Sequence, residues 1–259
     1  METVGHLIKH WRGVRRKSQL ALAVQAGVSA RHVGFIEVGR AAPSREMVML
    51  LAGVLDVPLR ERNALLLAAG YAPVYRETGL EAPEMEQARQ AVALILEHQE
   101  PYPAFVLDRG WNSVLTNRAT ARLMEHLRGG VKHANVMRQV FDPEDVRPAI
   151  DNWEEVAGDL VRHLQAGVAA APWDAEARAL LEEALSYPGV PAGWHRPEPG
   201  ATPPPLLTCQ FRKGEQRLRF FTTLTTFGTP HDVTLQELRI ECWYPADEAT
   251  AAACRALAE

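Results

Sequence analysis

A pair of short helical patterns separated by Gly27 constrains the fold of this chain more than any other feature of its sequence. Ser18 and Ser29 stand at expected helix N-caps, because a serine hydroxyl can accept a hydrogen bond from a free N–H of the first turn. Gly27 supplies the left-handed conformation of a tight turn. Val33 and Ile36 are spaced to hold the second helix against the body of the domain. The pattern predicts a helix-turn-helix, whose second helix enters the major groove of DNA.

Hydrophobic spacing predicts five short helices in residues 1–72, which we expect to form an all-helical DNA-binding domain. In the second of these helices, Leu20, Ala23 and Val24 are expected to face inward. Pro43-Ser44 is expected to open the fourth helix, since serine is a favourable N-cap. A helical bundle used only for protein contacts is the alternative interpretation of this region.

Residues 73–100 are predicted to be a linker and a connecting helix. The stretch Tyr71–Pro83 contains prolines and a glycine and has no helical or strand periodicity. An apolar stripe at helical spacing then runs through Glu84–Glu100. This helix could connect the domains or form a dimer contact, or it could pack on its own domain, and the sequence leaves both interpretations open.

The segment Ser18–Arg40 and the residues after it resemble the repressor-type helix-turn-helix family named after the Xre regulator. The resemblance implies a DNA-binding domain. The matching residues are Gln19, Leu22-Ala23, Gly27-Val28-Ser29, Ile36-Glu37-Val38-Gly39-Arg40 and Pro43-Ser44.

Candidate DNA contacts follow from the helix geometry and from this resemblance. Arg31 is placed to donate two hydrogen bonds to a guanine, and Phe35 to touch a thymine methyl group. Ala30 and His32 flank them on the exposed side of the same helix. The positions at which the family contacts phosphate, which orient the domain without reading sequence, are Gln19, Ser29, Arg40, Ser44 and Arg45.

The charge distribution agrees with a DNA-binding N-terminal region. The chain has a formal net charge of −4, but residues 1–80 carry +5 and the remainder carries −9. A basic head on an acidic body is typical of a DNA-binding domain joined to a domain with another role. The N-terminus lacks the apolar segment of a signal peptide, and no apolar run is long enough to cross a bilayer. We therefore expect a cytoplasmic protein that does not contact membranes.

Residues 101–259 are predicted to form an α+β domain with an antiparallel sheet. Short strand-like segments near Ala104–Leu107 and Trp111–Thr116 precede a run of helical patterns, and further strand-like segments follow. In Glu237–Tyr244 the apolar residues alternate strictly with Glu237, Arg239 and Glu241, as in a strand with two different faces.

This region resembles the ligand-binding domain of the MmyB-like regulators, in which it follows an Xre-type helix-turn-helix. The resemblance implies a PAS-like fold with an apolar pocket for a fatty-acid-like molecule. The helix-turn-helix here is the compact Xre form rather than the extended form common in those regulators, so the DNA site is expected to differ. The matching segments are Pro103–Val106, Trp111–Ala119, Asn135–Arg138 with Phe141, Trp153-Glu154, and Thr226–Leu235.

An apolar pocket needs large hydrophobic side chains on a sheet face and on the opposing helices, with one or two polar anchors. Each candidate could instead belong to the ordinary core. Possible anchors for a carboxylate are Arg138, His163 and His231. The apolar candidates are Phe105, Leu107, Trp111, Leu115, Leu218, Phe220, Leu224, Leu238 and Ile240 on strands, and Trp153, Val156, Leu160 and Leu164 on helices.

Enzyme motifs are absent from the sequence: there is no G-x-S-x-G, Walker loop, G-x-G-x-x-G or H-E-x-x-H. Cys209, Cys242 and Cys254 are expected to be reduced, buried thiols, and no metal site is expected. The sequence thus predicts a non-enzymatic regulator, more often a repressor in such families, that binds operator DNA as a homodimer. Its second domain is expected to sense a small apolar ligand such as a fatty acid, without a further cofactor. Alternatively, that domain serves only dimerisation or partner contacts.

Overall fold

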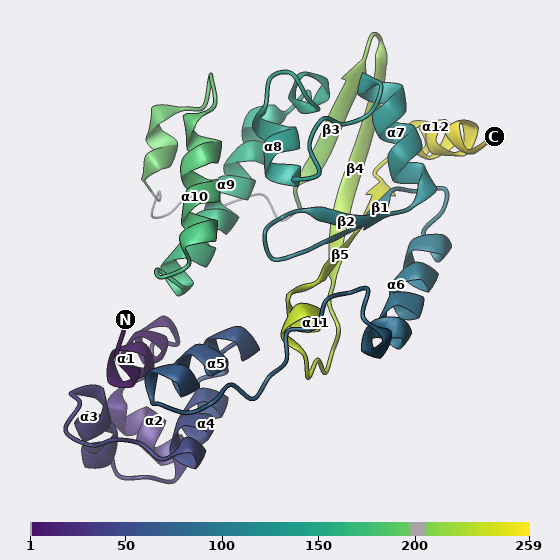
Figure 1. Ribbon diagram of the computed structural model, residues 1–259. Helices are drawn as coiled ribbons and strands as arrows, with labels where there is room; N and C mark the ends of the chain where they lie inside the picture. Colours follow the sequence, from purple (N-terminus) through teal and green to yellow (C-terminus); the bar gives the residue numbers. More distant parts are fainter. Residues whose placement is uncertain (1, 197–205) are drawn as a thin grey trace. The chain divides into compact units, whose positions relative to one another are not determined.

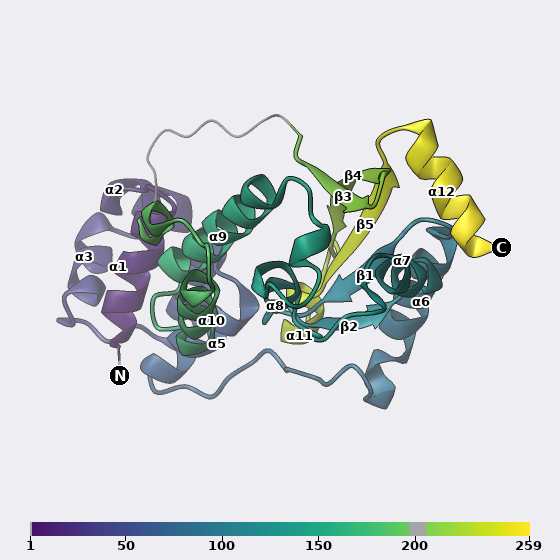
Figure 2. The ribbon, with the colours of Figure 1, turned by 90° about the horizontal axis from the view of Figure 1, so that it is seen from above.

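The computed structural model describes residues 2–196 and 206–259 and divides into two compact units (Figures 1 and 2). The helical unit contains Met1–Ala82 and Gly228–Gln236. The sheet unit contains Pro83–Phe227 and Glu237–Glu259. These limits differ from the predicted boundaries at residues 72 and 100. The irregular stretch after residue 72 packs with the helical unit, the helix that follows packs with the sheet unit, and a late segment of the chain returns to the helical unit.

The helices of the N-terminal region agree with the prediction. The hydroxyl of Ser18 accepts a hydrogen bond from Ala21 N, and that of Ser29 accepts one from His32 N. Gly27 adopts a φ of 67° between the two helices, as the turn requires. The elements are α1 (Val4–Val14), α2 (Gln19–Ala26), α3 (Ala30–Glu37), α4 (Arg45–Val54) and α5 (Leu59–Ala68).

The core of the helical unit corrects one prediction. Leu22, Ala23 and Ala26 form the buried face of α2, whereas Leu20 and Val24 are 64% and 72% exposed. Helix α2 has only eight residues, so a shift of its buried stripe by one or two positions satisfies the same apolar spacing.

Helices α1 and α3 approach each other closely at Gly5. A Cβ atom at this position would lie 2.3 Å from the backbone oxygen of Ile36 and 2.9 Å from that of Glu37. Only glycine leaves room for this approach, because neither backbone oxygen can move without displacing α3. Gly13, on the same helix α1, has open space at the equivalent position.

The segment Gly228–Gln236 is bonded into the helical unit although it lies more than 150 residues further along the chain. The carboxylate of Asp232 accepts hydrogen bonds from Thr78 Oγ1 at 2.7 Å and from Thr78 N at 3.2 Å. Gln236 Oε1 accepts from the backbone N–H of Leu59, at the start of α5, at 2.6 Å. These hydrogen bonds make the segment part of the helical unit.

The sheet unit is built on an antiparallel sheet with strand order β2-β1-β5-β4-β3 in the described residues. The predicted α+β class is therefore confirmed. The strands are β1 (Ala104–Leu107), β2 (Ser113–Thr116), β3 (Thr208–Lys213), β4 (Gln216–Thr225) and β5 (Arg239–Pro245). The short helix α11 (Val233–Glu237) precedes β5.

Helices cover the sheet and enclose the core. Figures 1 and 2 both show α8, α9 and α10 together on one side of the sheet. Asn117 caps α7, its side chain accepting a hydrogen bond from Thr120 N. The helices of this unit are α6 (Glu86–His98), α7 (Arg118–Arg128), α8 (Val136–Phe141), α9 (Trp153–Ala170), α10 (Ala175–Ser186) and α12 (Glu248–Ala258).

Helix α6 packs on its own unit, one of the two alternatives left open by the sequence. Val92 and Leu96 are buried, and Leu96 O accepts a hydrogen bond from Asn117 Nδ2. Just beyond the helix, Gln99 Nε2 donates to the backbone oxygen of Trp243 in β5 at 2.8 Å. These contacts fix α6 to the sheet.

Candidate functional site

The predicted recognition helix α3 exposes Arg31 and leaves the other candidate base contacts partly accessible. Arg31 is exposed, and its guanidinium carbon lies 5.1 Å from the centre of the Phe35 ring. Val33 and Ile36 on the opposite side are fully buried, which fixes the rotation of the helix. Ala30, His32 and Phe35 are half-buried beside Arg31. The helix thus presents a cation and an aromatic edge outward, as contact with base edges would require.

The predicted phosphate-contact residues surround α3 in the helical unit. Ser29 and Ser44 are exposed N-caps of α3 and α4, and Arg45 is exposed in the first turn of α4. Arg40 is exposed after α3 ends. Gln19 differs from the others, because its side-chain amide donates to Glu37 Oε2 at 2.7 Å. One amide hydrogen and the carbonyl oxygen remain for other contacts.

A buried ion pair positions α3 on α1, and the sequence analysis missed it. Arg12 Nε donates to Glu37 Oε1 at 2.6 Å, and Arg12 Nη2 donates to Glu37 Oε2 at 3.0 Å. The side chain of Glu37 is 1% exposed. Burial raises the pKa of Glu37, but the hydrogen bonds from Arg12 and Gln19 outweigh it and leave the pKa below 4.5. The sequence did contain a signal for this pair, because Glu37 lies at helical spacing beside Val33 and Ile36, which are buried.

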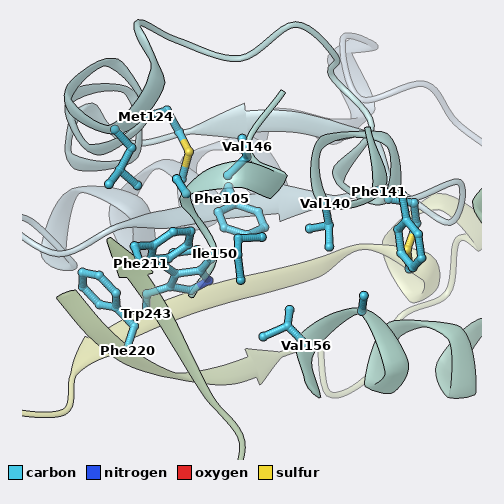
Figure 3. Close-up of a cluster of buried hydrophobic side chains, with 14 of the residues drawn as sticks. Phe105, Met124, Val140, Phe141, Val146, Ile150, Val156, Phe211, Phe220 and Trp243 are labelled. Carbon is cyan, nitrogen blue, oxygen red and sulfur yellow. The ribbon is translucent and has the colours of Figure 1, made fainter. Parts of the chain in front are cut away.

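The sheet unit encloses a cavity of about 710 Å³ between the sheet and its helices. Figure 3 shows the apolar side chains of this region, including Phe105, Met124, Val140, Ile150 and Trp243. The volume lies in the range of about 300–1,000 Å³ usual for small-molecule sites. The predicted ligand residues that line the cavity are Phe105, Leu107, Trp111, Val156, Leu160, His163 and Leu224.

Three predicted cavity residues, Leu115, Leu238 and Ile240, do not line the cavity. Leu238 and Ile240 flank Arg239, whose side chain faces the cavity. Leu115 pairs with Val106, so it also points away from the cavity, and it is 38% exposed. The predicted alternation of two faces was correct, but the wrong face was assigned to the cavity. Apolar residues are buried on both faces of this sheet, so hydrophobicity alone does not identify the face that borders the ligand site.

Other predicted residues belong to the core or the surface rather than to the cavity lining. Trp153 donates from Nε1 to Val140 O and stacks on Arg147, and Phe220 packs against Phe211 and Trp243. Leu164 and Leu218 are buried in the core. Arg138 pairs with Glu183 at 2.7 Å, so it does not anchor a ligand in the cavity. His231, the third proposed anchor, lies in the segment that joins the helical unit.

Most polar groups at one end of the cavity were missed. Arg239 and Glu241 of β5 and Asp159 of α9 line it there, beside His163 of α9, which was predicted. The register places Glu241 between Phe105 of β1 and Leu224 of β4, in the centre of the sheet. The cavity therefore combines an apolar body with a charged end, a pattern typical of sites for amphipathic molecules.

The cysteines are free thiols, as expected. Burial raises the pKa of Cys209 and Cys242 and raises that of Cys254 to about 11, so little reactive thiolate forms near neutral pH. Across residues 2–196 and 206–259, His, Cys, Asp and Glu form no cluster suited to a metal ion. In the same residues, no helix has the length and apolar character needed to span a bilayer.

Comparison with known families gives two matches that together cover most of the chain. The sequence model of the family described as "MmyB-like transcription regulator ligand binding domain" matches residues 88–257. A second family model, described as "Helix-turn-helix", matches residues 8–62. The first match covers most of the cavity-bearing sheet unit, and the second runs from within α1 to within α5.

Searches of individual proteins add little. No curated protein matches the chain. Among solved structures, one described as "Structure of an RNA-binding Light-Oxygen-Voltage Receptor" is 12% identical, with a TM-score of 0.27. The match covers 98% of this chain but only 60% of that structure. At this TM-score, the similarity supports no conclusion about fold or activity.

Proposed function

Because the chain belongs to the family with an MmyB-like transcription regulator ligand-binding domain, joined to a helix-turn-helix, we propose that it is a ligand-controlled repressor. The helical unit would bind operator DNA, and the sheet unit would bind one apolar, fatty-acid-like molecule. Occupancy of the cavity would change the affinity for DNA. A ligand can do this only if it binds the DNA-competent and incompetent states with different affinities.

Base recognition is assigned to α3. Arg31 would donate in bidentate fashion to a guanine, and Phe35 would contact a thymine methyl group. The ion pair of Arg12 with Glu37 supports this assignment, because it holds α3 in one orientation on α1. Gln19, Ser29 and the other predicted phosphate contacts would fix the register of the domain on the duplex.

The operator is proposed to be read by a homodimer. A single helix-turn-helix buries little surface on DNA, so such domains usually act in pairs on two-fold sites. The half-sites would then lie about one helical turn, or 34–36 Å, apart.

The ligand site is assigned to the cavity of about 710 Å³. Its volume and its aromatic and aliphatic lining suit an alkyl chain, because burial of each methylene contributes about 0.8 kcal/mol. Trp111 and Trp243 both line the cavity, which makes tryptophan fluorescence a direct reporter of occupancy.

The single observation that carries ligand control is the course of the chain between β4 and β5. Thr222 and Leu224 of β4 and Arg239 of β5 line the cavity, and the chain between these strands includes Gly228–Gln236, which is bonded into the helical unit. A ligand that shifts the ends of β4 and β5 would therefore act on Asp232 and Gln236. These residues contact Thr78 and the start of α5.

The test is DNA affinity measured at fixed salt on a site selected from random duplexes by the full-length protein. Arg31→Ala should weaken binding to the selected site about ten-fold or more, as expected for loss of a bidentate base contact, with little effect on random DNA. Addition of dodecanoic acid should change the affinity of the wild-type protein. Equal binding of selected and random DNA would refute the DNA-reading role.

Two other results would separate the remaining parts of the proposal. If dodecanoic acid changes the tryptophan fluorescence but leaves DNA affinity unchanged, the cavity binds ligand without controlling DNA. If neither quantity changes with any long-chain amphiphile, the sheet unit serves dimerisation or partner contacts instead of sensing. Sedimentation of the free protein and of the complex gives the stoichiometry, and a single protomer on the selected site would refute the homodimer.

A further inference from the structure

The charged end of the cavity contains two polar groups with unused hydrogen-bonding capacity. Arg239 Nη2 donates to the backbone oxygen of Asp108 at 3.1 Å, and Glu241 Oε1 accepts from Trp243 Nε1 at 2.8 Å. Both side chains are on the cavity face of β5, two residues apart, so their Cα atoms are about 7 Å apart. The second carboxyl oxygen of Glu241 and the other guanidinium N–H groups have no hydrogen-bond partner among the described residues.

Arg239 is held in place by its aromatic neighbour. Its guanidinium carbon lies 4.2 Å from the centre of the Trp111 ring, a cation–π contact. Trp111 has a φ of 66°, in the left-handed region that bulky residues rarely adopt, and the neighbouring β1–β2 register shifts between Val106 and Leu107. Backbone strain of this kind persists where the surrounding structure enforces it, often at ligand sites.

A third polar group lies in the same row of the sheet. Ser113 pairs with Leu107, which in turn pairs with Arg239, so the three side chains share the cavity face. The hydroxyl oxygen of Ser113 is buried and has no hydrogen-bond partner in the described structure. Buried hydroxyl groups are rarely left unbonded. This independent observation indicates that a polar ligand group belongs beside Arg239.

Arg239 is the group at this end that favours an anion, because its buried guanidinium remains charged. The carboxylates of Glu241, Asp108 and Glu237 already act on it electrostatically, so an anion would bind through its free N–H groups. Burial raises the pKa of Glu241, although its hydrogen bond from Trp243 and the nearby Arg239 and His163 act in the opposite direction. Of the two ionisable groups on α9, Asp159 already pairs with Arg162 at 3.0 Å and lies 3.4 Å from His163 Nδ1.

We propose that Arg239, Glu241 and Ser113 form a head-group subsite that selects amphiphiles with one carboxylate. The carboxylate accepts hydrogen bonds from the guanidinium of Arg239 and from the hydroxyl of Ser113, and Glu241 lines the cavity beside them. The alkyl chain then extends over Phe105, Val140 and Val156. This assignment rests on the proposed ligand-binding role of the cavity and names the residues that define its specificity.

The experiment compares dodecanoic acid with dodecanol, which has the same chain and no charge, in full-length protein. Tryptophan fluorescence or calorimetry gives both dissociation constants. The wild type should bind the acid about ten-fold or more tightly than the alcohol, as expected for hydrogen bonds to a charged group. Arg239→Gln should remove most of this preference while leaving the affinity for dodecanol within about two-fold, because the apolar lining is unchanged.

Two further variants separate a specificity role from a structural one. Arg239→Lys keeps the charge and should keep part of the preference. Glu241→Gln removes a neighbouring carboxyl group and keeps the shape of the side chain, so it should retain the preference for the acid. Arg217→Gln, an exposed position on the same sheet outside the cavity, is the matched control and should change neither affinity.

The outcomes distinguish this inference from the function on which it rests. The subsite would be overturned if Arg239→Gln lost affinity for dodecanoic acid and for dodecanol equally and Arg239→Lys behaved in the same way. Tight binding of both compounds to the wild type without discrimination would also overturn it, while leaving the ligand-binding role intact. Failure of the wild type to bind either compound would remove the proposed ligand role and the subsite together.

Discussion

The helical unit and the sheet unit use their charged residues in opposite ways. In the helical unit, the candidate functional residue Arg31 is exposed, and the buried ion pair of Arg12 with Glu37 serves to orient the helix that carries it. In the sheet unit, the candidate functional groups Arg239 and Glu241 face an internal cavity. DNA must be met at the surface, whereas an apolar ligand has to be removed from water.

This difference also separates the two units in their tolerance of substitution. Exposed residues of α3 can change without altering the fold, because surface substitutions usually change stability by less than about 0.5 kcal/mol. Cavity residues contribute to the core and to the ligand site at once.

The largest effect is expected for Glu37→Gln. It leaves the guanidinium of Arg12 partly buried without its anion, and breaking a buried pair from one side costs about 3–5 kcal/mol. Thermal or urea unfolding should show a destabilised helical unit, and binding to selected DNA should weaken. The double variant Arg12→Met with Glu37→Met should cost less, since no unpaired charge remains. If Glu37→Gln unfolds no more easily than the double variant, the orienting role of the pair is contradicted.

The same ion pair predicts the response of the helical unit to acid. The folded-state pKa of Glu37 is lowered, so its stabilising contribution is present above its ordinary value of 4.5 and is lost as the pH falls through the folded-state pKa. Unfolding followed between neutral pH and pH 3 should therefore show the helical unit losing stability in the lower part of this range. In Glu37→Gln this part of the loss should be absent.

Leu107→Ala and Leu115→Ala compare the two faces of the sheet. Leu107 is fully buried and lines the cavity, whereas Leu115 is 38% exposed on the other side. Truncation of Leu107 should destabilise the sheet unit by about 2–5 kcal/mol, and that of Leu115 by less than about 0.5 kcal/mol. Dodecanoic acid binding should change only in the first variant. Equal effects in the two variants would contradict the assignment of the cavity face.

The two units also differed in how far the sequence could predict them. Helix spacing, serine caps and Gly27 are local signals, so α1–α5 and the exposed side of α3 were predicted in agreement with the structure. The strands were predicted from alternation, but the face of β5 that borders the cavity was not. Ile240 and Cys242 are buried on one face and Trp243 on the other, so burial does not distinguish the two faces. Periodicity defines two faces and does not say which one borders a cavity.

Long-range contacts explain the remaining differences. The pairing of Arg12 with Glu37 spans 25 residues, and that of Thr78 with Asp232 spans 154. Neither partner carries a local pattern that identifies the other. The sequence therefore gave no reason to place Gly228–Gln236 in the helical unit, and the predicted domain boundaries followed chain order.

Gly5→Ala and Gly13→Ala apply one substitution at two positions of α1 with opposite expected signs. At Gly5 the new methyl group would meet the backbone of Ile36 and Glu37, and overpacking of this kind costs about 1–3 kcal/mol. At Gly13 there is open space, and alanine should stabilise the helix by up to about 1 kcal/mol. Unfolding of the helical unit measures both. Destabilisation by Gly13→Ala would show that helix propensity does not govern that position.

The smallest effect on stability, and the most informative for coupling, is expected for Thr78→Val. The substitution preserves the shape of the side chain but removes the hydrogen bond from Thr78 Oγ1 to Asp232, at a cost of about 1 kcal/mol. Ligand affinity and ligand-free DNA affinity should stay within about two-fold of wild type, since each site keeps its own contacts. The change in DNA affinity caused by dodecanoic acid should shrink, because Gly228–Gln236 is held less firmly in the helical unit. Thr225→Val, at the exposed end of β4, is the matched control and should keep the full response. If the double variant Thr78→Val with Gln236→Ala keeps the full change in DNA affinity on addition of dodecanoic acid, this segment is excluded as the route between ligand and DNA.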